Sequence, residues 1–198
     1  MRLILKDSVD SDNLYKRPAL FLDRDGVINQ DLGYVHHKDN FIFLPTIFKL
    51  ISTANAHGYF VIIITNQAGI GRGLYSEEDF RQLSLWMLDQ IKNNDGSVNA
   101  IYYSPFHPTK GLHKYLLHEN TRKPGSGMFA EALQNFNIDI PRSVMVGDKI
   151  SDMTASITAK VGKNFLLHKM NDNLLDTELL QSITVVQDLN PIIAFLGD

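Results

Sequence analysis

The chain has 198 residues, of which 44% are hydrophobic and 21% are charged, and its formal net charge at pH 7 is -3. We therefore expect one globular domain with a substantial core over residues 1–198, of which residues 1–17 form an N-terminal extension. The absence of cysteine excludes a disulfide scaffold, and the acidic balance gives no general footprint for nucleic acid.

The apolar runs are all too short to span a membrane. Only four apolar residues precede Lys6, which is too few for the core of a signal peptide. We therefore expect a cytoplasmic protein, without a membrane or nucleic-acid partner, that acts as a monomer.

The first predicted element is a short buried strand at residues 19–22, because this run is apolar throughout. It ends in two carboxylates, Asp23 and Asp25, and Gly26 follows. Both carboxylates would face the crevice where open α/β folds bind ligands. One can attack as a nucleophile while the other donates and accepts protons. An ordinary Asp-Gly turn is the alternative, and this segment alone does not decide between the two.

Helix-like and strand-like segments alternate along the rest of the chain. Predicted helices cover residues 46–57, 76–92, 127–136 and 151–160, and predicted strands cover residues 60–64, 99–103, 143–146, 164–167 and 184–186. The alternation favours an α/β fold with three layers, in which a Rossmann-like parallel sheet carries helices on both faces. The segment between the first two strands is too short for a large cap domain, so loops alone would cover the site.

Residues suited to phosphoryl transfer follow several of these strands. The strand at 60–64 ends in Thr65-Asn66-Gln67, the strand at 143–146 ends in Gly147-Asp148, and Arg122-Lys123-Pro124 lies between them. Asp23 and Asp148 supply the hard oxygen ligands that Mg²⁺ prefers. Thr65 and Lys123 can hold phosphoryl oxygens as negative charge shifts in the transition state.

Each of these residues also has a purely structural interpretation. Thr65 suits a strand because it is β-branched, and Arg122 with Lys123 suits a solvated basic pair. Asp148 suits a turn or a helix N-cap. Asp152 is interpreted as ordering the loop around Asp148 rather than as a metal ligand. The glycine-rich segment 69–73 suits either a tight loop or a phosphate cradle.

In order and spacing, these segments resemble the motifs of the haloacid dehalogenase superfamily of Mg²⁺-dependent phosphatases, over residues 19–167. More closely, DRDGVIN, TNQAGIGRG, IYYSPFHP, RKPGSGM and VGDKISDM resemble the heptose-bisphosphate 7-phosphatases, with the histidinol-phosphate phosphatases as near relatives. The resemblance implies a hydrolase that acts through an aspartyl-phosphate and removes the 7-phosphate of D-glycero-D-manno-heptose 1,7-bisphosphate. The alternatives are histidinol phosphate or another small phosphomonoester, a nucleic-acid 3′-phosphate, and a non-catalytic scaffold.

The resemblance also implies a role for each matching residue. Asp23 would be the nucleophile, Asp25 the general acid/base, and Thr65 and Lys123 the catalytic contacts to the phosphoryl group. Mg²⁺ would be the cofactor, held by Asp23, by the backbone carbonyl of Asp25, and by Asp148. A small phosphorylated sugar would be bound by Asp31, Gly33, Tyr34, Asn66, Gln67, Ala68, Arg122 and Lys149.

One loop departs from these relatives, which carry a zinc site made by Cys-x-His and Cys-x-Cys pairs. The corresponding positions in this chain are Ser104, Phe106, Glu119 and Thr121. Because structural zinc sites rest on Cys and His ligands, we expect no structural zinc. A substitute site would need the irregularly spaced His107, His113, His118 and Glu119. We expect apolar packing to hold the loop instead, through Phe106, Leu112, Tyr115, Leu116 and Leu117.

Overall fold

A seven-stranded sheet forms the centre of the computed structural model, which describes residues 2–4, 15–117, 120–167 and 181–197. The strands are β1 (Arg2–Ile4), β2 (Ala19–Leu22), β3 (Phe60–Asn66), β4 (Ala100–Ser104), β5 (Val144–Gly147), β6 (Lys163–Leu167) and β7 (Thr184–Val186). Their order across the sheet is β1-β4-β3-β2-β5-β6-β7. Strands β2 to β7 run parallel, as predicted, whereas β1 adds an antiparallel edge strand beside β4.

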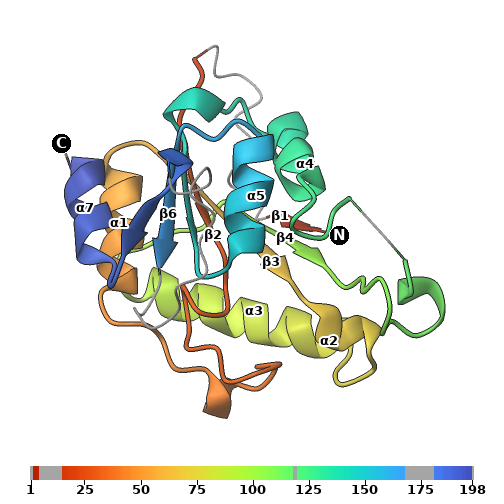
Figure 1. Ribbon diagram of the computed structural model, residues 1–198. Helices are drawn as coiled ribbons and strands as arrows, with labels where there is room; N and C mark the ends of the chain where they lie inside the picture. Colours follow the sequence, from red (N-terminus) through yellow and green to blue (C-terminus); the bar gives the residue numbers. More distant parts are fainter. Residues whose placement is uncertain (1, 5–14, 118–119, 168–180, 198) are drawn as a thin grey trace.

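Helices cover both faces of this sheet (Figure 1). One layer contains α1 (Ile47–Ala56), α3 (Glu77–Lys92) and α7 (Asn190–Gly197), and the opposite layer contains α4 (Gly127–Asn135) and α5 (Ile150–Thr158). The short helical turns are α2 (Ala68–Gly71), η2 (Lys38–Asn40), η3 (His113–Tyr115) and η4 (Ile140–Arg142). The predicted three-layer α/β fold is therefore confirmed.

Strand β2 lies at the centre of the sheet because both of its faces are apolar. Leu20 and Leu22 pack with the layer of α1, α3 and α7, while Ala19 and Phe21 pack with the layer of α4 and α5. A strand buried on both faces carries a continuous apolar run rather than an alternating pattern. Since β3 and β5 flank β2, the residues that follow these three strands meet at one edge of the sheet.

The structure extends one predicted strand and adds several elements. Strand β3 continues past the predicted end, so that Thr65 and Asn66 pair with Tyr103 and Ser104 of β4. Helix α2 is a single turn, and α7 follows β7 in a segment to which we assigned no element. Short helices of this kind carry little periodic signal.

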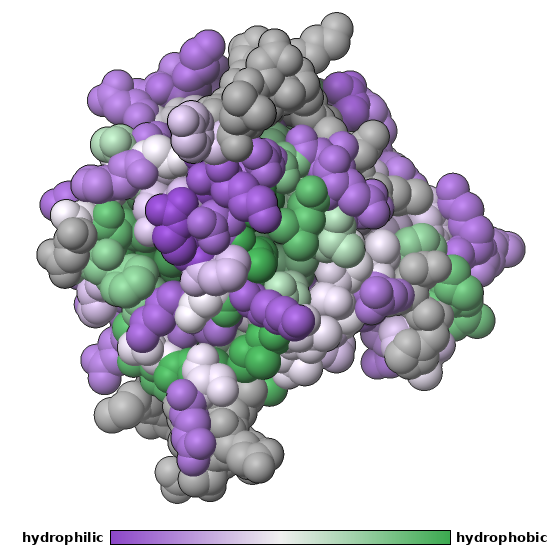
Figure 2. Space-filling view, turned by 90° about the horizontal axis from the view of Figure 1, so that it is seen from above, coloured by the Kyte–Doolittle hydropathy of each residue, from purple (hydrophilic) through white to green (hydrophobic). Residues whose placement is uncertain are grey.

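Hydrophilic side chains cover much of the face seen in Figure 2, and hydrophobic residues form smaller patches between them. Such a mixture is ordinary for a protein surface. Within the part of the chain that the structure describes, we find no helix with the length and apolar character that a membrane crossing requires.

The layer of α4 offers a test of this packing. Phe129 is fully buried, and its ring lies edge-on to that of Phe21 at 4.9 Å between centroids. We expect Phe129→Ala to lower the free energy of unfolding by about 3–5 kcal/mol in urea titrations, because it leaves a cavity. Leu133 lies on the same helix but is exposed, so Leu133→Ala should cost about 0.5 kcal/mol or less. Equal losses would contradict this assignment of the core face.

Candidate active site

A cleft of about 600 Å³ opens where β2, β3 and β5 end. The sequence-predicted residues that line it are Asp23, Asp25, Asp31, Gly33, Tyr34, Thr65, Asn66, Gln67, Ala68, Arg122, Lys123 and Lys149. Asp148 lies beside these residues, in contact range of Lys149. The cleft is also lined by residues to which we assigned no catalytic or substrate role, namely Tyr75, His107, Pro124, Ser151 and Asp152.

A buried ammonium group holds two carboxylates at the base of the cleft. Lys123 Nζ lies 3.0 Å from Asp23 Oδ1 and 2.7 Å from Asp152 Oδ1, and it donates to the carbonyl of Ile64 at 2.8 Å. Lys123 is 2% exposed, so the interpretation of Lys123 as part of a solvated pair is wrong. Three oxygen atoms thus surround this ammonium group, and its ion pair with Asp23 fixes the position of that carboxylate.

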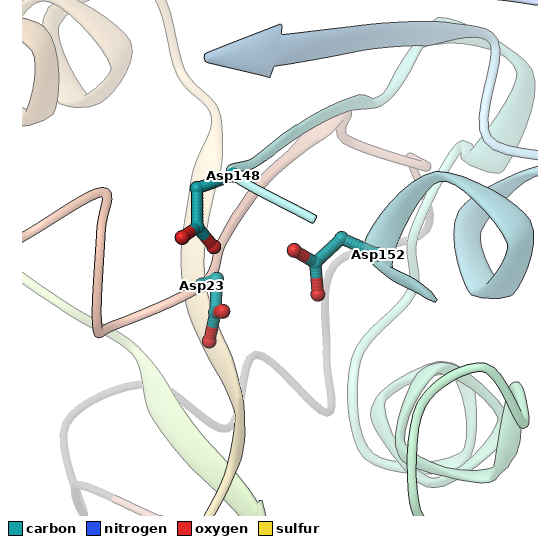
Figure 3. A group of neighbouring side chains, drawn as sticks. All are labelled: Asp23, Asp148 and Asp152. Carbon is teal, nitrogen blue, oxygen red and sulfur yellow. The ribbon is translucent and has the colours of Figure 1, made fainter. Parts of the chain in front are cut away.

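A third carboxylate completes an acidic cluster. Oxygen atoms of Asp23, Asp148 and Asp152 lie within 4.8 Å of one another, and Figure 3 shows the carboxylates of Asp148 and Asp152 pointing toward Asp23. Asp148 Oδ1 is buried and has no hydrogen-bond partner among the described residues. Helix α5 takes its N-cap from Lys149, so Asp148 is not the cap. Clustered carboxylates with an unsatisfied oxygen fit a hard divalent cation.

Burial and mutual repulsion raise two pKa values in this cluster. Burial raises the pKa of Asp23 to about 6 against the opposing charge of Lys123, and Asp152 contributes to the rise. Burial and the charge of Asp23 raise the pKa of Asp148 to about 7. Burial opposes the charge of Lys123, but its two carboxylate partners raise its pKa, so the ammonium stays protonated. The cluster therefore takes up protons near neutral pH unless a cation replaces them.

Two glycines allow the carboxylates to approach the backbone closely. Gly26 has φ +90°, and a Cβ atom there would lie 2.2 Å from Asp148 Oδ2. A Cβ atom on Gly147 would lie 2.3 Å from Cβ of Asp152. Glycine adopts this positive φ readily, and the same position also makes room for Asp148.

Three neighbouring side chains orient the carboxylate of Asp25. Arg24 Nη2 lies 2.8 Å from both of its oxygens and also donates to the carbonyl of Val35. Asn29 Nδ2 donates to Oδ1 at 3.0 Å, and Gln67 Nε2 donates to Oδ2 at 3.1 Å. The sequence motif identified Asp25 but gave no sign that the buried Arg24 would be its partner.

The end of β3 is tied to the loop that carries Lys123. Asn66 Nδ2 donates to the carbonyl of Lys123, and Asn66 Oδ1 accepts from its backbone N–H, each at 3.0 Å. Thr65 Oγ1 accepts a hydrogen bond from Gln67 Nε2 at 2.8 Å. Asn66 and Gln67 thus line the cleft, but protein groups already engage their side-chain amides.

The rim of the cleft carries two further contacts. Lys149 Nζ donates to Asp31 Oδ2 at 2.9 Å, and Asp31 Oδ1 accepts the N–H of Gly33. These bonds lower the pKa of Asp31 despite its partial burial. On the other side, the guanidinium of Arg72 lies over the ring of Tyr34 at 5.0 Å and donates to its hydroxyl.

His107 is a cleft residue that we considered only as a zinc ligand. Its Nδ1 accepts the backbone N–H groups of Thr109 and Lys110 at 3.2 and 3.0 Å, so its hydrogen is on Nε2. Burial and the nearby charges of Arg122 and Lys110 lower the pKa of His107, which favours the neutral ring. Arg122 Nη1 donates to the carbonyl of Phe106 at 3.1 Å.

The family described as polynucleotide kinase 3 phosphatase matches residues 21–172. The D-glycero-alpha-D-manno-heptose-1,7-bisphosphate 7-phosphatase of Burkholderia mallei is 43% identical over 181 residues, which cover 91% of this chain and 94% of the relative. The D-glycero-beta-D-manno-heptose-1,7-bisphosphate 7-phosphatase of Vibrio cholerae is 44% identical over 151 residues, which cover 76% of this chain and 81% of the relative. This chain belongs to the haloacid dehalogenase superfamily of phosphatases.

A solved structure supports the same assignment of this phosphatase. It is the D,D-heptose 1,7-bisphosphate phosphatase from B. bronchiseptica, complexed with magnesium and phosphate. Its TM-score is 0.75 at 26% identity, and the match covers 90% of this chain and 97% of that one.

The loop that departs from the relatives is held differently from our expectation. Leu112, Leu116 and Leu117 are 52%, 51% and 45% exposed, so the apolar packing that we predicted for these three is wrong. Tyr115 does pack against the core, with its ring 6.2 Å from that of Phe106.

Hydrogen bonds anchor this loop of the phosphatase to α2 and α3. The N–H of Leu112 donates to the carbonyl of Gly71 at 2.7 Å, and the Tyr115 hydroxyl donates to Glu77 Oε1 at 2.5 Å. Ser104 Oγ and Thr121 Oγ1, at two of the zinc-ligand positions, are buried without a hydrogen-bond partner among the described residues. His118 and Glu119 lie outside the described residues.

The raised pKa values predict how one carboxylate affects stability. The pKa of Asp148 is higher in the folded protein than in the unfolded chain, so its contribution to stability falls as pH rises from about 4 to about 7 and stays low above that. In chelator, Asp148→Asn should therefore raise the free energy of unfolding at about pH 8 by on the order of 2 kcal/mol. At about pH 5 the gain should be less than half as large, because the cost of protonating the carboxyl on folding grows with the interval between the pH and its pKa in the unfolded chain.

The exposed Asp39 provides a matched control for this measurement. Asp39→Asn also replaces a carboxylate by an amide, but in solvent, so it should leave the free energy of unfolding nearly unchanged at both pH values. A loss of stability in Asp148→Asn at the higher pH would contradict the predicted repulsion within the cluster.

Proposed function

We propose that this phosphatase removes the 7-phosphate of D-glycero-D-manno-heptose 1,7-bisphosphate, with Asp23 as the nucleophile and Mg²⁺ as the cofactor. The observation that carries the proposal is the acidic cluster around Asp23, which Lys123 holds at the edge of the cleft. The names of the relatives supply the substrate.

The proposed reaction has two steps. Asp23 attacks phosphorus and forms an aspartyl-phosphate, while the bond from phosphorus to the sugar oxygen breaks and Asp25 gives its proton to that oxygen. Asp25 then takes a proton from water, whose oxygen attacks phosphorus and releases inorganic phosphate and free Asp23. Both carboxylates line the cleft, and the three hydrogen-bonding neighbours of Asp25 hold it there.

Other residues would bind the phosphoryl group and the cation. Thr65 and the charged Lys123 lie where they can stabilise phosphoryl oxygens. Asp23, Asp148 and the backbone carbonyl of Asp25 would hold Mg²⁺, which when bound neutralises charge and provides a template for the phosphoryl group. The buried, unpartnered Asp148 Oδ1 supports this ligand set, and we propose that Asp152 serves Lys123 and the start of α5 instead.

The remainder of the substrate would lie along the rim of the cleft. We assign sugar and second-phosphate contacts to Asp31, Gly33, Tyr34, Asn66, Gln67, Ala68, Arg122 and Lys149, all of which line it. The relatives act on the alpha and on the beta anomer, so anomer preference is part of the test. Because one chain supplies every assigned group, we also propose a single-domain, cytoplasmic monomer that needs no nucleic-acid or membrane partner.

A nucleic-acid 3′-phosphate is the second candidate substrate. The family description names a polynucleotide phosphatase, whereas the net charge of -3 does not favour a polyanion.

The proposal is tested by Mg²⁺-dependent phosphate release from both anomers of the heptose bisphosphate, histidinol phosphate and a 3′-phosphorylated oligonucleotide. We expect kcat/KM for one heptose anomer to exceed that for the last two substrates by about a hundredfold, because the rim would contact the sugar and its second phosphate. Asp23→Asn is the control and should abolish turnover. Near-normal turnover in Asp23→Asn would refute the mechanism, and faster oligonucleotide hydrolysis would favour the second candidate.

Metal analysis provides a separate test of the cofactor. We expect the purified protein to contain no stoichiometric zinc, because it offers no cysteine ligands. Mg²⁺ should raise the melting temperature more at about pH 8 than at about pH 5.5, because protons compete for carboxylates with raised pKa values. Asp148→Asn should lose most of this Mg²⁺ effect. One zinc per chain, or an equal Mg²⁺ effect at both pH values, would contradict these assignments.

A further inference from the structure

Tyr75 lies in the cleft without a role in the reaction as described so far. It sits between α2 and α3, is 7% exposed, and lines the cleft beside Asp25 and Gln67. Its hydroxyl donates to Gln67 Oε1 at 2.5 Å. Burial raises the pKa of Tyr75, so this hydroxyl keeps its proton throughout the working pH range.

The amide of Gln67 connects Tyr75 to Asp25 and Thr65, two residues of the proposed reaction. Its Nε2 donates to Asp25 Oδ2 at 3.1 Å and to Thr65 Oγ1 at 2.8 Å, which uses both of its hydrogens. A flipped amide would place Oε1 against the carboxylate of Asp25 and remove its donor. Because the Tyr75 hydroxyl donates to Oε1, it favours the orientation in which Nε2 faces Asp25.

The ring of Tyr75 is itself held from several sides. The imidazole of His36 stacks on it at 5.1 Å between centroids, with an interplanar angle of 6°. A Cβ atom on Gly69 would lie 2.1 Å from Cε1 of the ring, so only glycine allows this approach. Ser76, the next residue, is the N-cap of α3 and forms a capping box with Asp79. Position 69 of the glycine-rich segment therefore makes room for Tyr75.

We propose that Tyr75 is a positioning residue for the general acid/base, and that it acts through Gln67 on the carboxyl group of Asp25. This inference rests on the proposed function, in which Asp25 gives its proton to the sugar oxygen as the bond to phosphorus breaks. Tyr75 transfers no proton itself, and no covalent bond to it forms or breaks.

The inference predicts a dependence on the leaving group that a general loss of structure would not produce. An alkoxide leaving group needs a proton in the transition state, whereas p-nitrophenolate is stable enough to leave without one. A misplaced Asp25 should therefore slow the first step, measured as release of the leaving group in a single turnover, for a sugar phosphate and have little effect on that step for p-nitrophenyl phosphate. A disturbed nucleophile or cation site would slow both.

The experiment compares Tyr75→Phe with Tyr103→Phe on the full-length protein with Mg²⁺. Tyr103 is another buried tyrosine whose hydroxyl donates, in its case to Glu77 Oε2 at 3.1 Å. For Tyr75→Phe we expect the single-turnover rate of leaving-group release at saturation to fall about tenfold for the heptose bisphosphate, and by about twofold or less for p-nitrophenyl phosphate. Tyr103→Phe should leave both rates within about twofold of the wild type.

A second variant keeps the inference testable if Tyr75→Phe does not fold. Gln67→Met keeps the length of the side chain but removes the N–H donors and the acceptor oxygen of its amide, so it should show the same split in leaving-group release between the two substrates. Equal losses on the two substrates in Tyr75→Phe or in Gln67→Met, or no loss on the sugar phosphate, would overturn the inference.

Asp25→Asn separates failure of this inference from failure of the proposed function. The comparison uses the single-turnover rate of leaving-group release, because Asp25 also acts in the second step, which both substrates share. If Asp25→Asn slows this release far more for the sugar phosphate than for the aryl phosphate while Tyr75→Phe does not, the inference alone fails. If Asp25→Asn slows the release equally for both substrates, Asp25 is not the acid, and the proposed mechanism fails together with the inference.

Discussion

The site depends on one buried ammonium group placed between two carboxylates. A buried charge that loses its partners costs several kcal/mol, so Lys123 must meet Asp23, Asp152 and the carbonyl of Ile64 at once. These partners come from β2, α5 and β3. The paired hydrogen bonds of Asn66 bring the Lys123 backbone to this point. The contacts that stabilise the buried charge of Lys123 thus also fix the position of Asp23, the proposed nucleophile.

The local sequence predicted strands whose ends coincide with the ends of a buried apolar run. It did not predict features that depend on contacts between distant parts of the chain. The continuous apolar run of β2 gave its bounds correctly, whereas β3 is longer because Thr65 and Asn66 pair with β4. The acids at the strand ends could be predicted from their positions and from family resemblance. The pairing of Lys123 with Asp152, the clamp of Arg24 on Asp25 and the contact of Tyr75 with Gln67 could not be predicted, since each needs the assembled backbone.

The described part of the loop at 104–121 is held by contacts to neighbouring elements. Its contacts to Gly71 and Glu77 join it to the segment that also carries Tyr75. Its leucines are exposed, and Phe106 and Tyr115 supply the inward packing. Ser104 and Thr121, at two positions where the family resemblance implied zinc ligands, carry buried hydroxyls instead.

The placement of β2 between β3 and β5 also bears on how the enzyme matures. Leu20 pairs with Val144, so Asp23, the proposed nucleophile, meets its acidic neighbours only after a chain segment of more than a hundred residues has closed. Such closure is entropically costly and typically slow. A nascent chain on the ribosome therefore lacks a partial active site until β5 has emerged. Phosphatase activity therefore requires that the centre of the sheet has folded, and a chain terminated before β5 would have no activity on any substrate.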